Sequence, residues 1–484
     1  MTTHKLTSVA RAFALAAGLS LLSGGCHLLD ITNPDIVPGE NLNSPLALPT
    51  IRAGAIGDFT LAYSGSGASG SQGTVEGQIM ISGLMADEWV NTETFPDRVQ
   101  ADARQVDPSS ATFSTVFRNL ARARLSAENA AAKFRQLADT TTDAGLSELL
   151  SLAGFTYTLF AENYCSGVPF SNPNPDGTVR YGVPLTTSQM LDTAIERFNE
   201  ALVAALALPA ASRGPWVALA AVGKARALLD SGDVVAADTV ASTANVSTTF
   251  SYVVQHSLNS TREQNGVFNA VRNFKRYGVP SGREGGNGLD WRSVAAGQDP
   301  RTPIVRAPST NKGFDGVTPQ YDQLRYVDRK ASVTLATGLE ARLINAEAGL
   351  RRGDTTGFMT QLNGLRASPP AYILAGDTTN VTAQGNPVAA MPPLATPASD
   401  TAAVTLLFTE RARWLWATGH RLNDLRRLVR PVGTRGGYGR ATESVFPTGL
   451  YFKNGLSYGT DVNYPVPIDE RNNPNFTQCL DRLP

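Results

Sequence analysis

The stretches ARALLDSGD (residues 225–233) and AEAGLRRGD (residues 346–354) share the pattern A-x-A-x-L-x-x-G-D. The alanines let a neighbouring helix approach closely, and the glycine suits the left-handed position that ends a helix. The aspartate then caps the helix that follows. Each copy therefore predicts a helix hairpin of tetratricopeptide type, and such hairpins must stack on one another to bury their apolar faces.

Apolar residues spaced at i, i+3 and i+4 extend this helical pattern along the chain. The segments that show it are residues 112–138, 146–164, 188–206, 215–229, 234–242, 333–351, 356–366 and 404–429. Runs with the two-residue alternation of strands are few and short. The sequence therefore predicts a mainly α fold.

Long segments rich in glycine, proline and serine separate the helices. They are residues 63–77, 91–110, 169–187, 281–316 and 368–399. Loops of this length in a compact protein are usually functional or disordered. A helical scaffold that carries large loops is typical of a binding protein.

The first 25 residues have the layout of a secretory signal peptide. A weakly basic start is followed by an apolar run at residues 12–22, and then by small residues and Cys26. The run is too short to span a bilayer, which takes about 20 residues. The layout resembles that of bacterial lipoproteins, in which the cysteine becomes the lipidated N-terminus; residues 26–45 then form a leash. An ordinary secreted protein with an incidental cysteine is the alternative.

Cys165 and Cys479 are the two cysteines that remain. In an exported protein they are candidates for a single disulfide. Closing a loop of roughly 300 residues removes considerable entropy from the unfolded chain. Two separate buried thiols are the alternative, and the sequence does not decide between them.

Composition and motifs argue against nucleic-acid binding and catalysis. The 42 Lys and Arg residues balance 42 Asp and Glu residues, so no broad positive field attracts nucleic acid. Outside residues 1–45 the only histidines are His256 and His420, and the motifs H-E-x-x-H, paired C-x-x-C and G-x-S-x-G are missing. We therefore expect no enzyme activity, no catalytic residue, no bound metal and no cofactor.

Arginines are concentrated near the end of the predicted helix 404–429 and just after it. They are Arg421, Arg426, Arg427, Arg430 and Arg435. Phosphate or nucleic-acid contact is one interpretation of such a cluster. We expect instead a solvated helix face with intramolecular salt bridges, and a buried structural hydrogen bond for the neighbouring His420.

Several segments resemble those of one known family. They are ERARWLWATGHRLNDLRR (residues 410–427), YPVPIDERNNPNF (464–476), LEARLINAEA with QLNGLR (339–348 and 361–366), and residues 160–169 with their Gly-Val-Pro ending. In order and spacing they resemble the SusD/RagB family of outer-membrane nutrient-binding lipoproteins. The resemblance implies a mainly α, SusD-like fold, with tetratricopeptide-type helix hairpins packed against a loop-rich region with little β structure.

The same resemblance implies a function in nutrient uptake. Members of the family cover a SusC-like TonB-dependent barrel and capture oligosaccharides or peptides. The chain is thus expected to be an outward-facing, lipid-anchored protein of the outer membrane that binds glycans and delivers them to that transporter. Residues 46–300 correspond to a SusD-like N-terminal part with helix hairpins and residues 301–484 to a RagB/SusD-type C-terminal part. Three alternatives stay open: a peptide-binding member of the family, a secreted tetratricopeptide-type scaffold without nutrient binding, and a hydrolase with an unrecognised site.

Two loop regions offer candidate ligand contacts. Glycan capture needs flat apolar faces for the sugar rings and planar hydrogen-bonding groups, which aromatic, Arg and Asn side chains supply. In the family the ligand surface draws on loops in roughly these two regions, although no motif fixes individual residues and a packing role is the alternative for each. The candidates are Trp89, Asn91, Phe95 and Arg98 in the first region and Arg276, Tyr277, Trp291 and Arg292 in the second.

Overall fold

The computed structural model describes residues 42–484 apart from residues 69–73, 175, 283–287, 293–297, 309 and 454. The predicted signal peptide (residues 1–25), Cys26 and most of the predicted leash lie outside the described residues. Residues 48–484 form one compact unit, and the unit before it contributes the short helix η2 (Pro45–Ala47). The predicted division of the chain at residue 300 falls inside this compact unit and stays a prediction.

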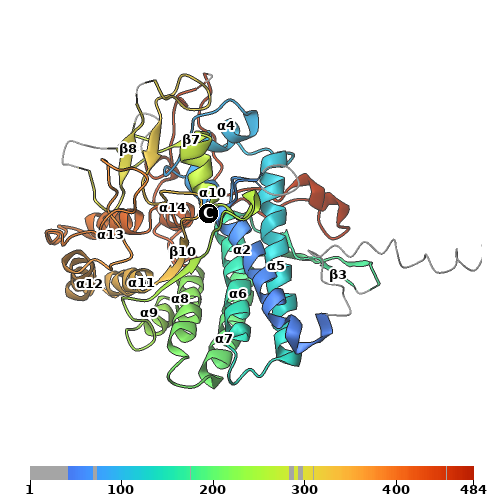
Figure 1. The fold of residues 1–484 in the computed structure, drawn as a ribbon. Coiled ribbons are helices and arrows are strands. Elements are labelled where there is room, and N and C mark those ends of the chain that lie inside the picture. Colours follow the sequence, from blue (N-terminus) through green and yellow to red (C-terminus); the bar gives the residue numbers. More distant parts are fainter. Residues whose placement is uncertain are drawn as a thin grey trace, which may run out of the picture. The chain divides into compact units, whose positions relative to one another are not determined.

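Long α-helices form the scaffold of the compact unit (Figure 1). Consecutive helices α5 to α8 pack on one another, and α2 packs on α5. No helix among the described residues is long and apolar enough to cross a membrane. The α-helices are α2 (Leu48–Ser64), α3 (Gln78–Met85), α4 (Pro96–Asp102), α5 (Ala111–Leu137), α6 (Gly145–Asn163), α7 (Thr187–Ala207), α8 (Gly214–Ser231), α9 (Val234–Val240), α10 (Gly266–Phe268), α11 (Gly338–Arg351), α12 (Thr355–Ala367), α13 (Asp400–Trp414) and α14 (Arg421–Val429).

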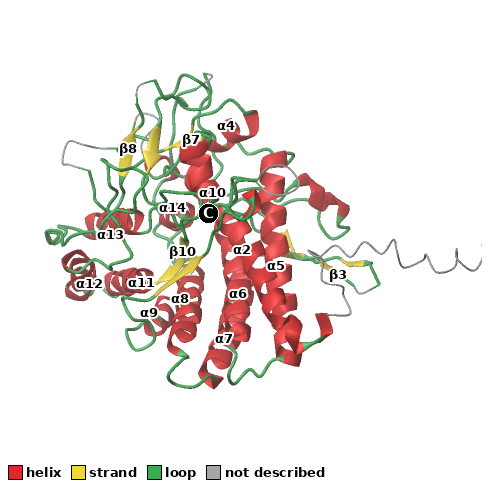
Figure 2. Ribbon diagram, viewed as in Figure 1, coloured by secondary structure: helices red, strands yellow, loops and turns green. Residues whose placement is uncertain are grey.

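Strands are short and pair two by two in antiparallel ladders (Figure 2). The pairs are β1 (Val90–Asn91) with β7 (Tyr277–Gly278), β2 (Val168–Pro169) with β5 (Pro184–Leu185), β3 (Asn172–Pro173) with β4 (Val179–Arg180), β6 (Ser251–Val254) with β10 (Val333–Thr337), and β8 (Ile304–Arg306) with β9 (Tyr321–Gln323). The remaining short helices are η4 (Thr261–Glu263), η5 (Asn269–Asn273), η6 (Thr442–Ser444) and η7 (Ile468–Asn472). The predicted mainly α fold with little β structure is confirmed.

Both copies of the A-x-A-x-L-x-x-G-D pattern form the predicted hairpin. Gly232 adopts a left-handed backbone (φ 95°) after α8, and Asp233 then accepts a hydrogen bond from the N–H of Ala236 at the start of α9. In the second copy Gly353 has φ 72° after α11, and Asp354 caps α12 in the same way. The local chemistry of the pattern therefore fixes both turns.

Two of the predicted helices differ in extent from the observed ones. The segment 333–351 begins as strand β10, in which three of the five residues are β-branched, and becomes helical only at Gly338, where the Thr337 hydroxyl caps α11. The segment 404–429 is broken into α13 and α14. Ala417 (φ 58°) and Gly419 (φ 78°) have left-handed backbones between them, which ends a right-handed helix.

The C-terminal segment returns to the helical scaffold. The Tyr464 N–H donates to the Asn163 carbonyl at the end of α6 (2.8 Å), and the Tyr464 hydroxyl donates to the Ile81 carbonyl in α3 (3.0 Å). Cys479 forms a disulfide with Cys165, which follows α6, and their Cα atoms are 6.0 Å apart. Of the two alternatives that the sequence left open, the structure contains the single disulfide.

The predicted solvated face of the arginine cluster is wrong, because helix α14 is buried. The exposed fractions of Arg421, Arg426, Arg427 and Arg430 are 7% or less. Arg421 and Arg427 form the expected salt bridges, but these lie in the core, whereas Arg426 and Arg430 donate to backbone carbonyls. Asp87 and Glu347 come from other elements packed against α14, which is why the sequence of α14 alone did not show that it is covered.

Arg427 illustrates these buried pairs. Its guanidinium donates to both carboxylate oxygens of Glu347 in α11, at 2.7 and 3.0 Å, and to Asp424 at 3.0 Å. The neighbouring His420 is buried, with Nε2 3.0 Å from Glu340 Oε1 and Nδ1 2.9 Å from the Thr418 hydroxyl. The expected structural role of His420 is therefore confirmed.

Glu88, just after α3, gives a testable pH dependence. Its carboxyl is buried and accepts a hydrogen bond from the Ala417 N–H at 2.8 Å. Burial raises the pKa of Glu88 from 4.5 to about 8, although that hydrogen bond and Arg421 lower it. The folded protein thus keeps a proton that the unfolded chain has released, so the free energy of unfolding falls as the pH rises from about 4.5 to about 8.

Replacing Glu88 with glutamine is expected to remove this contribution and keep an acceptor for the Ala417 N–H. Between pH 6 and pH 7 the wild type should lose about 1.4 kcal/mol more of its free energy of unfolding than the variant, which is the value of one pKa unit. Urea unfolding at both pH values measures the difference. Parallel losses in the two proteins contradict the prediction.

Candidate ligand-binding surface

The antiparallel pair β1–β7 joins the two loop regions that the sequence analysis selected. Asn91 lies opposite Tyr277 in the ladder. The pairing continues through Thr92, whose N–H donates to the Arg276 carbonyl (2.9 Å) and whose hydroxyl donates to the Lys275 carbonyl (2.8 Å). Segments that are 183 positions apart along the chain therefore share one surface.

Two arginines and two acids form an ion-pair network at this ladder. Arg98, in α4, pairs through Nε with Glu76 and lies 3.0 Å from Glu93 Oε1. Arg276 Nε is 3.6 Å from Glu93 Oε2, and the Tyr277 hydroxyl donates to Glu76 at 2.7 Å. Burial raises the pKa of Glu93 to about 7, although Arg98 and Arg276 lower it. The network thus holds one acid that titrates near neutral pH.

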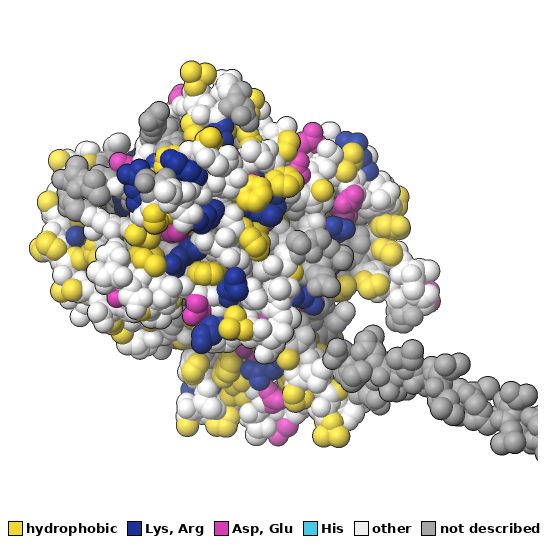
Figure 3. Space-filling model, turned by 45° about the horizontal axis from the view of Figure 1, so that its top comes forward, with side chains coloured by type: hydrophobic (Ala, Val, Ile, Leu, Met, Phe, Trp, Pro, Cys, Tyr) yellow, Lys and Arg dark blue, Asp and Glu magenta, His cyan; other side chains and the backbone are white. Residues whose placement is uncertain are grey.

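A cavity of about 570 Å³ opens beside this network. Two exposed aromatic residues directly adjoin its lining residues Thr94 and Asp315 in the sequence: Phe95 is 49% exposed and Phe314 is 54% exposed. The Arg98 guanidinium lies 5.3 Å from the centre of the Phe95 ring, and that of Arg276 lies 5.8 Å from the centre of the Phe314 ring. Figure 3 shows hydrophobic and basic side chains next to one another on the side that carries α4 and β7. The cavity is lined by Glu93, Thr94, Asp315, Val317, Thr318, Phe452 and Lys453.

Asp315 and Lys453 hold two of the loops that wall the cavity. Lys453 Nζ is 2.7 Å from Asp315 Oδ2 and donates to the Glu93 carbonyl at 3.2 Å. Asp315 also accepts hydrogen bonds from the N–H groups of Val317 and Thr318, at 2.9 and 2.8 Å. Although burial opposes them, Lys453 and Thr318 lower the pKa of Asp315, so this carboxylate is ionised at neutral pH.

Five of the eight predicted residues come together here, but three of these are buried. Asn91 and Tyr277 are fully covered and Arg98 is 7% exposed, so these three position the surface from beneath and do not offer the ligand contact that we expected. Phe95 is well exposed and the Arg276 side chain is 24% exposed. For these two residues, contact with a ligand stays a prediction.

The other three predicted residues lie elsewhere. Trp89 and Trp291 are each 1% exposed, and their ring centres lie 5.9 and 6.3 Å from that of Trp416. They form a buried aromatic cluster, so the packing alternative applies to both. The Arg292 guanidinium lies 4.0 Å from the centre of the Tyr321 ring on β9.

Sequence reasoning missed several residues of the surface. Phe314 and Asp315 belong to the predicted loop 281–316, so the length of that loop was a usable signal. Nothing in the local sequence marks Phe452 and Lys453, which reach the cavity from the C-terminal segment. Glu93 was overlooked because a lone acid in a loop is ordinarily solvated.

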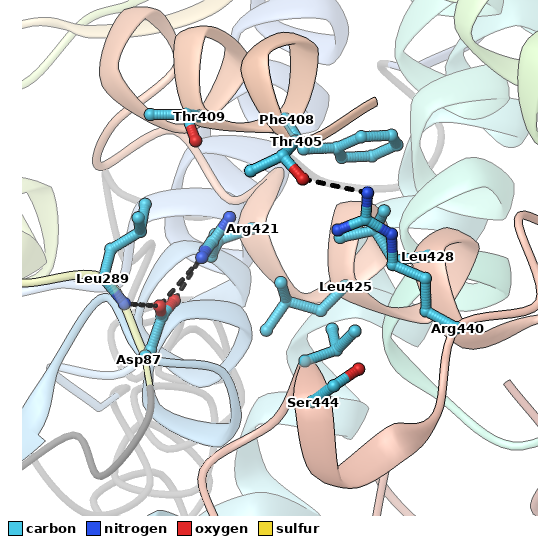
Figure 4. A pocket seen from close by; sticks show the side chains of 12 residues that line it. Asp87, Leu289, Thr405, Phe408, Thr409, Arg421, Leu425, Leu428, Arg440 and Ser444 are labelled. Atoms are coloured by element: carbon cyan, nitrogen blue, oxygen red, sulfur yellow. Dashed lines mark hydrogen bonds and ion pairs between the residues drawn. The ribbon is translucent and has the colours of Figure 1, made fainter. Parts of the chain in front are cut away.

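A second cavity, of about 210 Å³, lies beside α13 and α14 (Figure 4). Arg421 and Asp87 pair at its wall, with Nε to Oδ1 at 2.5 Å, and Asp87 also accepts a hydrogen bond from the Leu289 N–H at 2.6 Å. Arg440 donates to the Thr405 hydroxyl at 3.0 Å. The volume of this cavity is below the range of about 300 to 1,000 Å³ that is usual for ligand sites, so we assign no ligand to it. Among the described residues no group of three or more His, Cys, Asp and Glu side chains is placed to hold a metal ion.

No family model and no curated protein matches the sequence. Solved structures, in contrast, match nearly the whole chain. A SusD-like protein from Bacteroides fragilis is 14% identical, with a TM-score of 0.61 over 92% of this chain and 99% of that protein. A SusD superfamily protein from Bacteroides vulgatus is 13% identical, with a TM-score of 0.57 over 91% of this chain and 99% of that protein. The chain has a SusD-like fold.

The SusD-like fold is the one that the sequence resemblance implied, so that prediction is confirmed. A third similar structure is that of a laminarin-binding SusD-like protein, 15% identical, with a TM-score of 0.59 over 90% of this chain and 99% of that protein. At such low identity the likeness concerns the fold. The side chains of this chain determine the chemistry of the candidate surface.

Proposed function

We propose that this SusD-like chain is a cell-surface lipoprotein of the SusD/RagB family that binds glycans and delivers them to a SusC-like TonB-dependent transporter in the outer membrane. The observation that carries the proposal is the cavity whose lining residues Thr94 and Asp315 have the exposed Phe95 and Phe314 as sequence neighbours, on a fold shared with a laminarin-binding protein. Binding requires no covalent step.

The side chains at the cavity suit an oligosaccharide. Exposed phenylalanine rings offer flat apolar faces to the C–H groups of a sugar ring. Asp315, Thr318 and Lys453 offer acceptors and donors to its hydroxyl groups. The cavity volume lies within the range of about 300 to 1,000 Å³ that is usual for ligand sites. Asp315 is paired with Lys453 and its pKa is lowered, so this acid has no proton to donate near neutral pH.

Replacing Phe314 with alanine is expected to weaken glycan binding about tenfold, since a stacked aromatic contact contributes up to about 1.5 kcal/mol. Isothermal titration calorimetry against a panel of glycans and peptides, including laminarin oligosaccharides, measures the effect. Val203→Ala is the matched control, because Val203 is 71% exposed on α7 and lies outside the cavity lining.

Two results of this screen count against the proposal. If Phe314→Ala binds glycans as tightly as the wild type, the cavity is not part of the glycan-binding site. Binding of peptides without any glycan supports the peptide-binding alternative.

The proposed anchor makes a separate prediction. Two or more acyl chains on Cys26 give a lasting attachment to the membrane, where one chain is marginal. Cys26→Ser is therefore expected to move the protein from the membrane fraction to the soluble fraction, as followed by immunoblotting after fractionation. Retention of the variant in the membrane fraction means that lipid is not the tether. Co-isolation of a TonB-dependent barrel with the detergent-extracted wild type tests the proposed partner.

A further inference from the structure

The net charge of the candidate surface depends on the protonation of Glu93. This acid lies between two arginines, with Oε1 3.0 Å from Arg98 Nε and Oε2 3.6 Å from Arg276 Nε. Arg98 has a second acidic partner, Glu76, which also accepts a hydrogen bond from Tyr277. Two acids balance two arginines when Glu93 is ionised. One positive charge is left over when Glu93 is protonated.

Arg276 is the member of the network that presents this charge to solvent. Its side chain is 24% exposed, against 9% for Arg98. Its guanidinium lies 5.4 and 5.8 Å from the ring centres of Phe274 and Phe314, so it faces the exposed aromatic surface. Among the described residues, neither carboxylate oxygen of Glu93 has a well-aligned hydrogen bond. The contact between Glu93 and Arg276 is therefore electrostatic, and a carboxylate on a ligand can compete for the guanidinium.

We propose that Glu93 sets the charge of the binding surface according to pH, so that the surface gains affinity for carboxylate-bearing oligosaccharides, such as uronic-acid oligomers, as the pH falls. Ionised Glu93 cancels Arg276 and leaves a surface suited to uncharged glycans. Protonated Glu93 releases Arg276 for the ligand. The inference rests on the proposed glycan-binding function and adds the ligand class.

Glu93 is an acid of this network that titrates near neutral pH, unlike Glu76 and Asp315. Burial raises the pKa of Glu93 to about 7 against the two arginines. The pKa values of Glu76 and Asp315 are both lowered, although burial opposes this, by Arg98 in the first case and by Lys453 in the second. The charged and titratable groups around Glu93 are Glu76 before α3, Arg98 and Asp102 of α4, Arg276 and Tyr277 at β7, Asp315 of the following loop and Lys453 of the C-terminal segment.

The experiment has to distinguish Glu93 from Asp102, a second acid with a raised pKa. Burial raises its pKa to about 7 as well, against hydrogen bonds from the Tyr451 hydroxyl (2.6 Å) and the Asn91 N–H (2.8 Å). A pH effect in the wild type could therefore come from either acid. Only substitution at Glu93 tells them apart.

The test compares a galacturonic-acid tetramer with a neutral galactose tetramer at pH 6.0 and pH 8.5 by isothermal titration calorimetry. The wild type should bind the acidic tetramer about fivefold more tightly at pH 6.0, in keeping with the modest strength of a partly exposed ion pair. Glu93→Gln should bind it at pH 8.5 as tightly as the wild type does at pH 6.0, with no pH dependence. Arg276→Gln should lose the gain.

The matched control is Glu196→Gln, which changes the net charge equally at a side chain that is 63% exposed on α7. This variant should keep the pH dependence of the wild type. Equal affinity for the acidic tetramer at both pH values overturns the inference, as does a pH dependence that survives in Glu93→Gln. The same pH response to an acidic peptide of equal charge overturns the assignment to oligosaccharides.

Failure of the inference and failure of the proposed function give different results. Binding of the neutral tetramer or of laminarin oligosaccharides without any binding of the acidic tetramer overturns only the inference. Absence of binding to every glycan overturns both.

Discussion

Replacing Cys479 with serine is expected to lower the free energy of unfolding by about 5 kcal/mol. The disulfide between Cys165 and Cys479 joins residues 314 positions apart. A cross-link over that length removes about 6 kcal/mol of unfolded-state entropy in the chain-entropy model, and the loss of a native disulfide usually costs about 2 to 5 kcal/mol. Cys479 is the better position for the substitution, because it is only partly buried, whereas Cys165 is fully buried and its replacement would also disturb packing. Urea unfolding followed by tryptophan fluorescence measures the loss.

The chain supplies its own control for this experiment. Cys26→Ser changes the cysteine that is not part of the disulfide and should leave the unfolding midpoint unchanged. Reduction of the wild type should reproduce the loss that is seen in Cys479→Ser. If oxidised wild type and Cys479→Ser unfold at the same urea concentration, the disulfide does not stabilise the native state.

Replacing Arg427 with methionine is expected to cost about 3 to 5 kcal/mol, the usual effect of breaking a buried ion pair from one side. Arg427 is 1% exposed. Its removal leaves the negative charges of Glu347 and Asp424 buried without the guanidinium that both of them contact. In the wild type, burial raises the pKa of Asp424, but Arg411 and Arg427 together lower it to about 2; in the variant only Arg411 still pairs with this acid.

A surface pair serves as the control for Arg427→Met. Arg352 pairs with Asp238 at 2.7 Å, but their side chains are 46% and 25% exposed. Arg352→Met should therefore change the free energy of unfolding by no more than about 0.5 kcal/mol. Adding Glu347→Gln to Arg427→Met should recover part of the loss, because one uncompensated buried charge disappears. Equal effects of the two arginine variants contradict the buried-pair interpretation.

The helix hairpins could be predicted because their determinants are local. Gly232 and Asp233 stand next to each other in the sequence and act within one turn. The break between α13 and α14 was harder to predict from the sequence, because the apolar spacing continues through it. Only the left-handed backbone at Ala417 and Gly419 interrupts the helix.

The parts that could not be predicted depend on long-range partners. Arg427 is buried because Glu347, 80 positions away, supplies the opposite charge, and nothing in α14 shows this. The candidate surface shows the same limit. The two loop regions could be selected by composition, but the two-residue ladder that joins them and the arrival of Lys453 depend on the whole fold.

Tyr464 has a consequence for the order of folding. Its ring lies 5.0 Å from that of Phe113 in α5, and its hydroxyl binds Ile81, 383 positions earlier. The contacts of Tyr464 with Phe113 and Ile81 therefore form only after the ribosome has made nearly all of the chain. Contacts this distant in sequence slow folding. A polypeptide of this design reaches its final packing only when its synthesis is almost complete.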